Sequence, residues 1–283
     1  MKLDRQKRKY PFLFLVFVHS LLVLYTFYKK KDRKSLSIVL SSFIGIAYIF
    51  DYVIIAIFGG YTYKPNIFKK KPLDKYLGSL FSQGVYVPFT ALFITAFQLG
   101  WKVKILFGLY FSIIENLFLR LNIYKHHWWR TIYTFVLIVL SFKGNDIWYE
   151  QLKKKNRAVL FLSLYFMIQT TWQNTMFVFT IFRKILYGKG KVKDLKEHFK
   201  LAPLHGMILS LYLAWQVRSH RAWSKGKMLL TMLIVDVYLM RKGVMRVQSV
   251  SLLFIKYTII FVSASIYQRL IYTDIGPDDK QQS

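Results

Sequence analysis

Glu115 lies inside an apolar segment, and two polar residues that follow it share its face of a helix. At about 100° per residue, Asn122 and His126 each fall within about 20° of Glu115. A carboxylate and an imidazole on one face could relay a proton, hold a cation or orient a phosphate headgroup. At the helical rise, Glu115 and His126 are about 16 Å apart along the axis, so we expect no direct contact between them. The structural alternative is that Glu115 bonds a polar group on a neighbouring helix.

Other polar side chains inside apolar segments are candidates for the same site because ionisable groups there are costly. Asp51 has no obvious partner in the sequence. Gln169 and Gln173 lie one helical turn apart, and such amides either bond across helices or line a polar substrate pocket. Asp236 and Lys256 lie in consecutive apolar segments, and we expect them to neutralise one another.

The four residues after His126 are His127, Trp128, Trp129 and Arg130. Amphipathic rings favour the headgroup layer of a membrane, so we interpret this group as interfacial anchors. The adjacent histidines point in different directions on a helix, and HExxH or comparable ligand spacing does not occur, so we expect no metal site. The chain contains no cysteine, no Walker motif and no dinucleotide fingerprint, and we expect no cofactor.

The elements that position these residues are long apolar runs. The chain has 283 residues, of which 54% are hydrophobic. Runs of this kind are long enough to cross a hydrocarbon layer of roughly 30 Å, and continuous runs favour helices over a barrel. We expect spans at about residues 11–28, 35–59, 77–101, 105–123, 128–142, 158–182, 202–217, 228–245 and 249–272.

The predicted fold is therefore an all-α, polytopic membrane bundle with about eight or nine transmembrane helices. It would form one membrane-embedded domain over residues 1–272, with possible halves 1–150 and 151–272, followed by a disordered tail at 273–283. The first segment has no small-residue cleavage site, so we expect it to be retained. We find no internal repeat in the sequence. Pro88 cannot donate its amide, which frees the carbonyl of Gly84 and predicts a kink beside Ser82 and Gln83.

The net charge of +29 comes from 42 Lys and Arg against 13 Asp and Glu. Nearly all the basic residues lie in short connections between the apolar runs, which indicates contact with anionic lipid headgroups rather than nucleic acid. Aromatic and aliphatic residues are interspersed with lysines at 143–157 and 183–200, and we expect both connections to lie on the membrane surface. The predicted location is the cell membrane, with multiple passes.

Four motifs of the first half form a pattern. These are Tyr63 to Pro65, the Gln-then-Val-Pro span from Ser82 to Pro88, the intramembrane Glu-x-Leu-Phe at Glu115 to Phe118, and Trp128-Trp129. With these motifs, roughly residues 10–150 resemble an uncharacterised family of small multi-spanning membrane proteins found in spore-forming Bacillota. The family implies a plasma-membrane location in a Gram-positive cell and carries no established activity.

Three functions are consistent with the sequence. The first is binding or transport of a small polar solute or a lipid at a polar centre built by Glu115, Gln169, Gln173 and Asp51. The second is an enzyme of lipid headgroups with Glu115 or His126 as general acid or base. The third is a structural or accessory membrane subunit that needs no site. A transporter requires a cavity near mid-membrane, and an enzyme requires its acid and base beside a groove.

Overall fold

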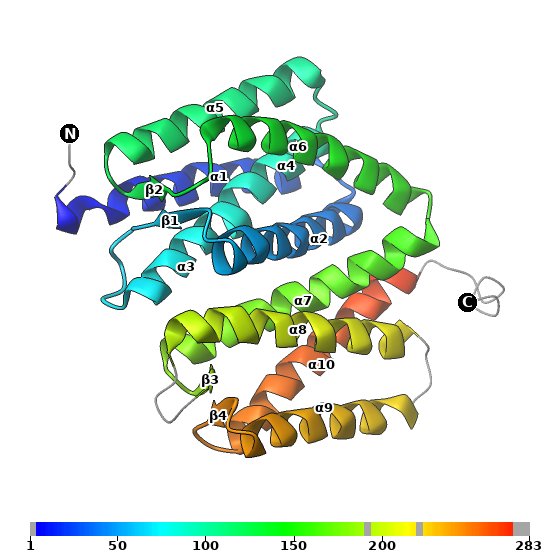
Figure 1. Cartoon of the computed structure of the whole chain (residues 1–283). Helices are drawn as coiled ribbons and strands as arrows, with labels where there is room; N and C mark the ends of the chain where they lie inside the picture. Colours follow the sequence, from blue (N-terminus) through cyan, green and yellow to red (C-terminus); the bar gives the residue numbers. More distant parts are fainter. Residues whose placement is uncertain (1–3, 190–193, 219–222, 274–283) are drawn as a thin grey trace. The chain divides into compact units, whose positions relative to one another are not determined.

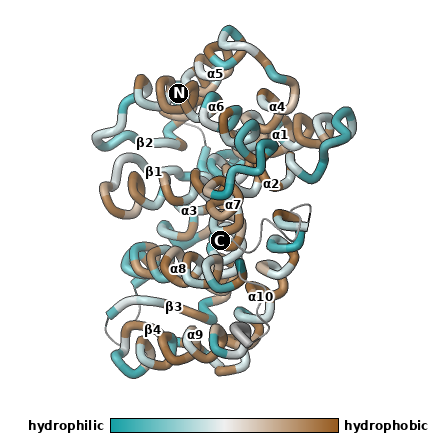
Figure 2. The backbone as a smooth tube through the Cα atoms, turned by 90° about the vertical axis from the view of Figure 1, so that its right-hand side faces the viewer, coloured by the Kyte–Doolittle hydropathy of each residue, from teal (hydrophilic) through white to brown (hydrophobic). Residues whose placement is uncertain are grey.

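The computed structural model describes residues 4–189, 194–218 and 223–273, and helices make up most of them (Figure 1). The chain divides into two compact units, unit 1 (Met1–Lys154) and unit 2 (Lys155–Ser283). Each of the nine predicted apolar segments coincides with one continuous helical stretch, so the all-α prediction is confirmed. Hydrophobic residues run along these helices, and hydrophilic residues gather at ends such as the α1–α2 connection (Figure 2).

Unit 1 contains six helices, two short strands and two π-helical segments, and a 3-10 turn precedes them at Arg5–Lys7. Helix α4 packs against α1, α2 and α6, and α5 packs against α6. In chain order the elements are α1 (Lys9–Lys29), α2 (Arg33–Asp51), a π segment (Tyr52–Ile57), β1 (Tyr61–Tyr63), α3 (Lys71–Phe81), a π segment (Ser82–Tyr86), α4 (Val87–Ala96), α5 (Trp101–Arg120), β2 (Tyr124–His126) and α6 (Thr131–Lys153).

The described residues of unit 2 form four helices and two short strands. Helix α7 packs against α8 and α10, and α8 also contacts α9 and α10. In chain order the elements are α7 (Arg157–Ile181), β3 (Ile185–Tyr187), α8 (Leu195–Arg218), α9 (Trp223–Arg241), β4 (Met245–Val247) and α10 (Ser251–Tyr272).

The two units repeat one topology. In each, a helical stretch leads into a three-residue strand, two helical stretches follow, and a second strand pairs antiparallel with the first before the last helix. In unit 1, α3, the π segment and α4 together form one of these stretches. Unit 1 adds α1 in front. Backbone hydrogen bonds just outside the strand pairs also correspond: Lys64 N–H donates to Ile123 O at 2.8 Å, and Gly188 N–H donates to Val244 O at 2.8 Å.

The turns that lead into the strands are also repeated. The turn after α5 contains Asn122 in the left-handed conformation, with φ of 55°. The turn after α9 contains Gly243 in the same conformation, with φ of 67°. Glu115 lies nine residues before the first residue of β2, and Asp236 lies nine residues before the first residue of β4 (124 − 115 and 245 − 236). The structure therefore contains a repeat that the sequence did not reveal, because topology and turn geometry are repeated whereas most side chains differ.

Fewer helices than the predicted eight or nine qualify as candidate membrane spans. Four helical stretches of the described chain are long and apolar enough to cross a membrane, at Arg5–Lys29, Arg33–Ile57, Lys71–Ala96 and Ser251–Tyr272. Charged residues explain part of the shortfall: α5 contains Lys102, Lys104 and Glu115, and α6 extends through the lysine-rich stretch to Lys153. Most of the predicted surface connection 143–157 is consequently the second half of α6. The predicted connection 183–200 contains β3 and the start of α8, and its residues 190–193 lie outside the described ones.

The predicted irregularity before Pro88 is present. Pro88 stands in the first turn of α4, and the residues before it, Ser82–Tyr86, form a π-helical segment that continues α3. Such a bulge follows when a helix cannot make its regular i to i−4 hydrogen bonds. It matters for function because Ser82 and Gln83 line a cavity.

Candidate functional site

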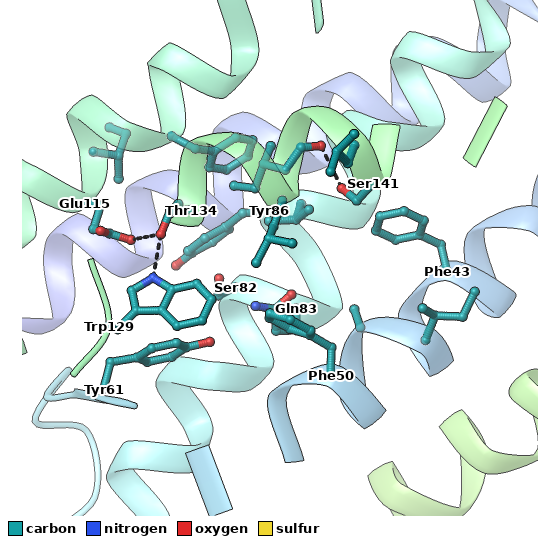
Figure 3. Close-up of a pocket in the computed structure, with 18 of the residues that line it drawn as sticks. Phe43, Phe50, Tyr61, Ser82, Gln83, Tyr86, Glu115, Trp129, Thr134 and Ser141 are labelled. Carbon is teal, nitrogen blue, oxygen red and sulfur yellow. Dashed lines mark hydrogen bonds between the residues drawn. The ribbon is translucent and has the colours of Figure 1, made fainter. Parts of the chain in front are cut away.

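Unit 1 contains a partly open cavity of about 480 Å³. Its wall is formed by side chains from α2, β1, the π segment before α4, α5, β2 and α6. Most of these are aromatic or aliphatic, and Figure 3 shows Phe43 and Phe50 among them. Glu115, Thr134 and Trp129 form a hydrogen-bonded polar group on one side of the cavity, and the amide of Gln83 lies between this group and Phe50 (Figure 3). A volume of this size is typical of small-molecule sites.

Glu115 is held by groups that the sequence did not place beside it. His126 Nε2 lies 2.9 Å from Glu115 Oε1, and the Thr134 hydroxyl donates to Oε2 at 2.5 Å. The Trp129 indole N–H donates in turn to Thr134 Oγ1 at 2.8 Å. The side chain of Glu115 is 9% exposed. The carboxylate is thus fixed in orientation at the cavity wall by two direct partners.

The contact between Glu115 and His126 contradicts the prediction that they are too far apart to touch. That prediction assumed one continuous helix, whereas α5 ends at Arg120 and the chain reverses at Asn122. A left-handed residue is the usual way to end a helix in a turn, and asparagine tolerates that conformation. Strand β2 then runs back beside the last turns of α5 and brings His126 to the carboxylate.

Asn122 therefore has a structural place in the turn. Its left-handed backbone redirects the chain, and its side-chain oxygen lies 3.5 Å from Lys64 Nζ. Asn122 is absent from the cavity wall. The helical projection placed Asn122 on the same face as Glu115. In the structure, Thr134 of α6 lies beside Glu115 instead.

Strands β1 and β2 form an aromatic floor of the site. Tyr61 packs against Tyr124 and Trp129, with ring centroids 5.3 Å apart in both pairs, and Tyr63 lies 4.8 Å from Tyr124. The strand register pairs Tyr61 with His126 and Tyr63 with Tyr124. Side chains alternate between the two faces of a strand, so the first and third residues of β1 and their partners on β2 share one face. The rings on this face therefore lie beside the carboxylate.

Asp51 has partners that the sequence did not indicate. Its carboxylate accepts hydrogen bonds from the hydroxyls of Tyr61 and Ser79, and the Gln83 amide lies 3.5 Å away. Asp51 is buried and does not line the cavity, whereas Tyr61 and Gln83 do. Asp51 therefore positions Tyr61 and Gln83.

The predicted interfacial anchors occupy different environments. Trp128 is 46% exposed and donates its indole N–H to Phe58 O, and Arg130 is exposed at the start of α6. Trp129 instead is buried and lines the cavity. Alternation along an extended segment, rather than a helix, explains why the two adjacent indoles differ.

His127 lies on the outer side of the strand pair, where its Nε2 is 3.0 Å from Thr62 Oγ1. Partial desolvation lowers the pKa of His127 below its ordinary value, and the ammonium groups of Lys125, Lys75 and Lys64 lower it further. Protonation of this ring is therefore disfavoured in the folded chain.

Gln169 and Gln173 belong to unit 2, whereas Glu115 and Asp51 belong to unit 1. Gln173 Nε2 donates to Pro203 O at 3.1 Å, which is an interhelical bond between α7 and α8. Gln169 is fully buried, and its amide has no hydrogen-bond partner among the described residues. The cavity of unit 1 is thus built without either glutamine.

Unit 2 has a buried polar cluster at the position that corresponds to Glu115. The Lys256 ammonium lies 2.5 Å from Asp236 Oδ2, the Tyr257 hydroxyl donates to the same oxygen at 2.6 Å, and His205 Nε2 is 3.3 Å from Oδ1. The side chains of Asp236 and Lys256 are both fully buried. The prediction that Asp236 and Lys256 neutralise each other is confirmed.

Sequence reasoning missed Thr134, Trp129 as a cavity residue, and Tyr61. Tyr61 and Trp129 lie in short aromatic segments next to glycine or asparagine, at 59–63 and 122–129, which is a signal typical of strands, whereas Thr134 lies in an apolar helix and carried no such signal. Within the described ranges, no group of three or more His, Asp or Glu residues could hold a metal ion. The site offers one carboxylate, one imidazole, hydroxyls and aromatic faces, which suit recognition of a polar group attached to an apolar body.

Comparison with known proteins adds no assignment. No family model, no curated protein and no solved structure matches the chain.

Proposed function

We propose that this chain is an integral membrane protein that binds an amphiphile, a lipid or lipid-like molecule, in the cavity of unit 1. The apolar body of the ligand would lie against the aromatic and aliphatic wall, and its polar end would reach Glu115. The observation that carries the proposal is the cavity of about 480 Å³ with a fixed carboxylate in its otherwise largely apolar wall. A pocket for a small polar solute would need more polar groups around the ligand than this wall supplies.

The outer faces of the helices support a membrane location. In α1, Phe14, Phe17 and Leu24 are 64%, 62% and 65% exposed, and in α10 Phe254, Val262 and Ile266 are more than half exposed. Large apolar side chains repeated along a helix exterior are costly in water and suit contact with lipid tails. Four helical stretches have the length and hydropathy for such a position.

An amphiphile in lipid gains little from burying its tail, because lipid tails are as apolar as the cavity wall. Selection must therefore come from the polar end and from shape. Glu115 meets this requirement, because both its oxygens are oriented by His126 and Thr134 before any ligand arrives. Preorganisation of this kind lowers the cost of binding.

Gly144 allows a direct test of the cavity. It lines the space on α6, and an added Cβ would meet no atom within 4 Å. Gly144→Phe should therefore enter open space and compete with the ligand without disturbing the wall. Gly144→Ala provides the reference for the gain in helix propensity, about 0.5–1 kcal/mol, that any replacement of this glycine brings.

Binding can be read from the indoles of Trp129 and Trp148, which line the cavity. A brominated alkyl amphiphile added to protein in uncharged detergent should quench them in Gly144→Ala and markedly less in Gly144→Phe. Ile147→Phe, which adds the same ring to an exposed position outside the wall, should quench like wild type. Equal quenching of Gly144→Phe and Gly144→Ala would contradict the proposal.

A further inference from the structure

The internal repeat places the acids of the two units in one structural position. Glu115 and Asp236 each lie nine residues before the second strand of their unit, and each has a partner on the helix that follows that strand. For Glu115 the partner is Thr134 of α6. For Asp236 the partners are Lys256 and Tyr257 of α10.

In unit 2 the cation that faces this acid belongs to the protein. The ammonium of Lys256 lies 4.3 Å from the centre of the Tyr257 ring and 5.4 Å from that of Trp172. Together with the 2.5 Å contact to Asp236, this gives a fully buried cation bound by a carboxylate and two aromatic faces. Carboxylates and aromatic rings are the groups that recognise ammonium ions in proteins.

Unit 1 has the acid and the rings but not the lysine. The corresponding turn of α6, Thr134–Leu137, reads Thr-Phe-Val-Leu and contains no basic residue. Leu137 instead lines the cavity beside Thr134. The rings of Tyr124 and Trp129 line the same space as Glu115. Where unit 2 supplies its own ammonium, unit 1 has a cavity.

We propose that the cavity of unit 1 selects amphiphiles whose polar end is positively charged, an amine or a quaternary ammonium, and holds that charge between Glu115 and the aromatic rings. This inference rests on the proposed function, since it names the ligand class for the same cavity. Lys256 then shows, within the same chain, how this fold binds an alkylammonium group.

His126 is compatible with this assignment. In the tautomer that carries its hydrogen on Nε2, the imidazole would donate to Glu115 Oε1 and orient the carboxylate. The Thr134 hydroxyl does the same for Oε2. Both contacts leave the carboxylate as the charged group of the cavity wall, available to a cation from the cavity side.

The test compares three amphiphiles with one tail, dodecyltrimethylammonium, dodecanol and dodecanoate, on the full chain in lipid nanodiscs without charged lipid. A brominated dodecyl probe in the cavity quenches the fluorescence of the indoles that line it. Each compound that displaces the probe restores this fluorescence, and the concentration needed reports its affinity. The cation should bind about tenfold or more tightly than the alcohol, and the anion more weakly than the alcohol, because a carboxylate in a low-dielectric wall attracts one charge and repels the other.

Two variants connect the preference to Glu115. Glu115→Gln keeps the shape and removes the charge, so the cation and the alcohol should bind within about twofold of each other. Leu137→Lys, which adds an ammonium to the cavity wall in the turn of α6 that corresponds to the turn with Lys256, should also remove the preference for the cation. Leu137→Met sets the level expected from the change of side-chain shape alone.

The outcomes separate the two proposals. Equal binding of cation and alcohol by wild type would overturn the charge assignment and leave the amphiphile cavity standing. Binding of none of the three would overturn the cavity function itself. Thermal unfolding shows whether Glu115→Gln has lost stability. If it has, and Leu137→Lys retains the full preference for the cation, the cation is not held at Glu115 and the inference is wrong.

Discussion

Removing the buried ammonium of unit 2 should destabilise the chain strongly. In Lys256→Met, Asp236 would keep one hydrogen bond while fully buried, from the Tyr257 hydroxyl at 2.6 Å, with His205 Nε2 3.3 Å from its other oxygen. Breaking a buried ion pair by deleting one partner typically costs about 3–5 kcal/mol. Because the Tyr257 hydrogen bond remains, we expect a loss of about 3 kcal/mol, roughly a hundredfold in the unfolding equilibrium.

The double variant separates loss of the pair from loss of packing. In Lys256→Met with Asp236→Leu, no uncompensated charge is left, and Tyr257 keeps Met232 O as an acceptor at 3.1 Å. We therefore expect the double variant to lie within about 1 kcal/mol of wild type. The free energy of unfolding can be measured by titration from mild detergent into dodecyl sulfate, followed by circular dichroism. A cost below about 1 kcal/mol for Lys256→Met, or a double variant less stable than that single variant, would refute the reasoning.

Three further outcomes follow from single contacts of unit 1. Gly78→Ala should lower the thermal unfolding temperature in detergent, because an added Cβ would lie 2.4 Å from the Cβ of Tyr63, whereas Gly144→Ala should not lower it. Asp74→Ala should loosen the β1–α3 connection, where this carboxylate accepts three backbone amides at 2.7–3.0 Å, and limited proteolysis should then cut there faster than in wild type. The pKa of His127 is lowered in the folded chain, so its contribution to stability is present above its ordinary pKa and is lost as pH falls through the folded value. The unfolding temperature should therefore fall more on acidification in wild type than in His127→Gln.

Helix positions were predictable because apolar runs bounded by basic clusters set them directly. The segment predicted at 158–182, for example, is α7 at Arg157–Ile181. The pairing of the three-residue strands was not predictable, because the strands are too short for a periodic pattern and pair residues about 65 positions apart, as in Tyr61 with His126. Without that pairing, a helical projection was the only available guide to the surroundings of Glu115.

The site was only partly predictable for the same reason. Glu115 stood out because a carboxylate in an apolar segment is costly. Thr134 did not, because a hydroxyl in an apolar helix satisfies itself on its own backbone and carries no signal. Asp236 with Lys256 was predictable, since two opposite charges in consecutive segments need each other. The repeat that connects Asp236 to Glu115 was hidden because it preserves spacing and turn geometry rather than residue identity.

The most direct test of the central claim is photoaffinity labelling with a dodecylammonium compound that carries a diazirine in its tail. We predict labelled peptides from the cavity-lining parts of α2, α5 and α6, around residues 43–50, 111–118 and 134–148, and loss of this labelling in Gly144→Phe but not in Ile147→Phe. Labelling confined to the outward-facing apolar side chains of α1 and α10, and unchanged in Gly144→Phe, would contradict the claim that unit 1 holds the amphiphile in its cavity.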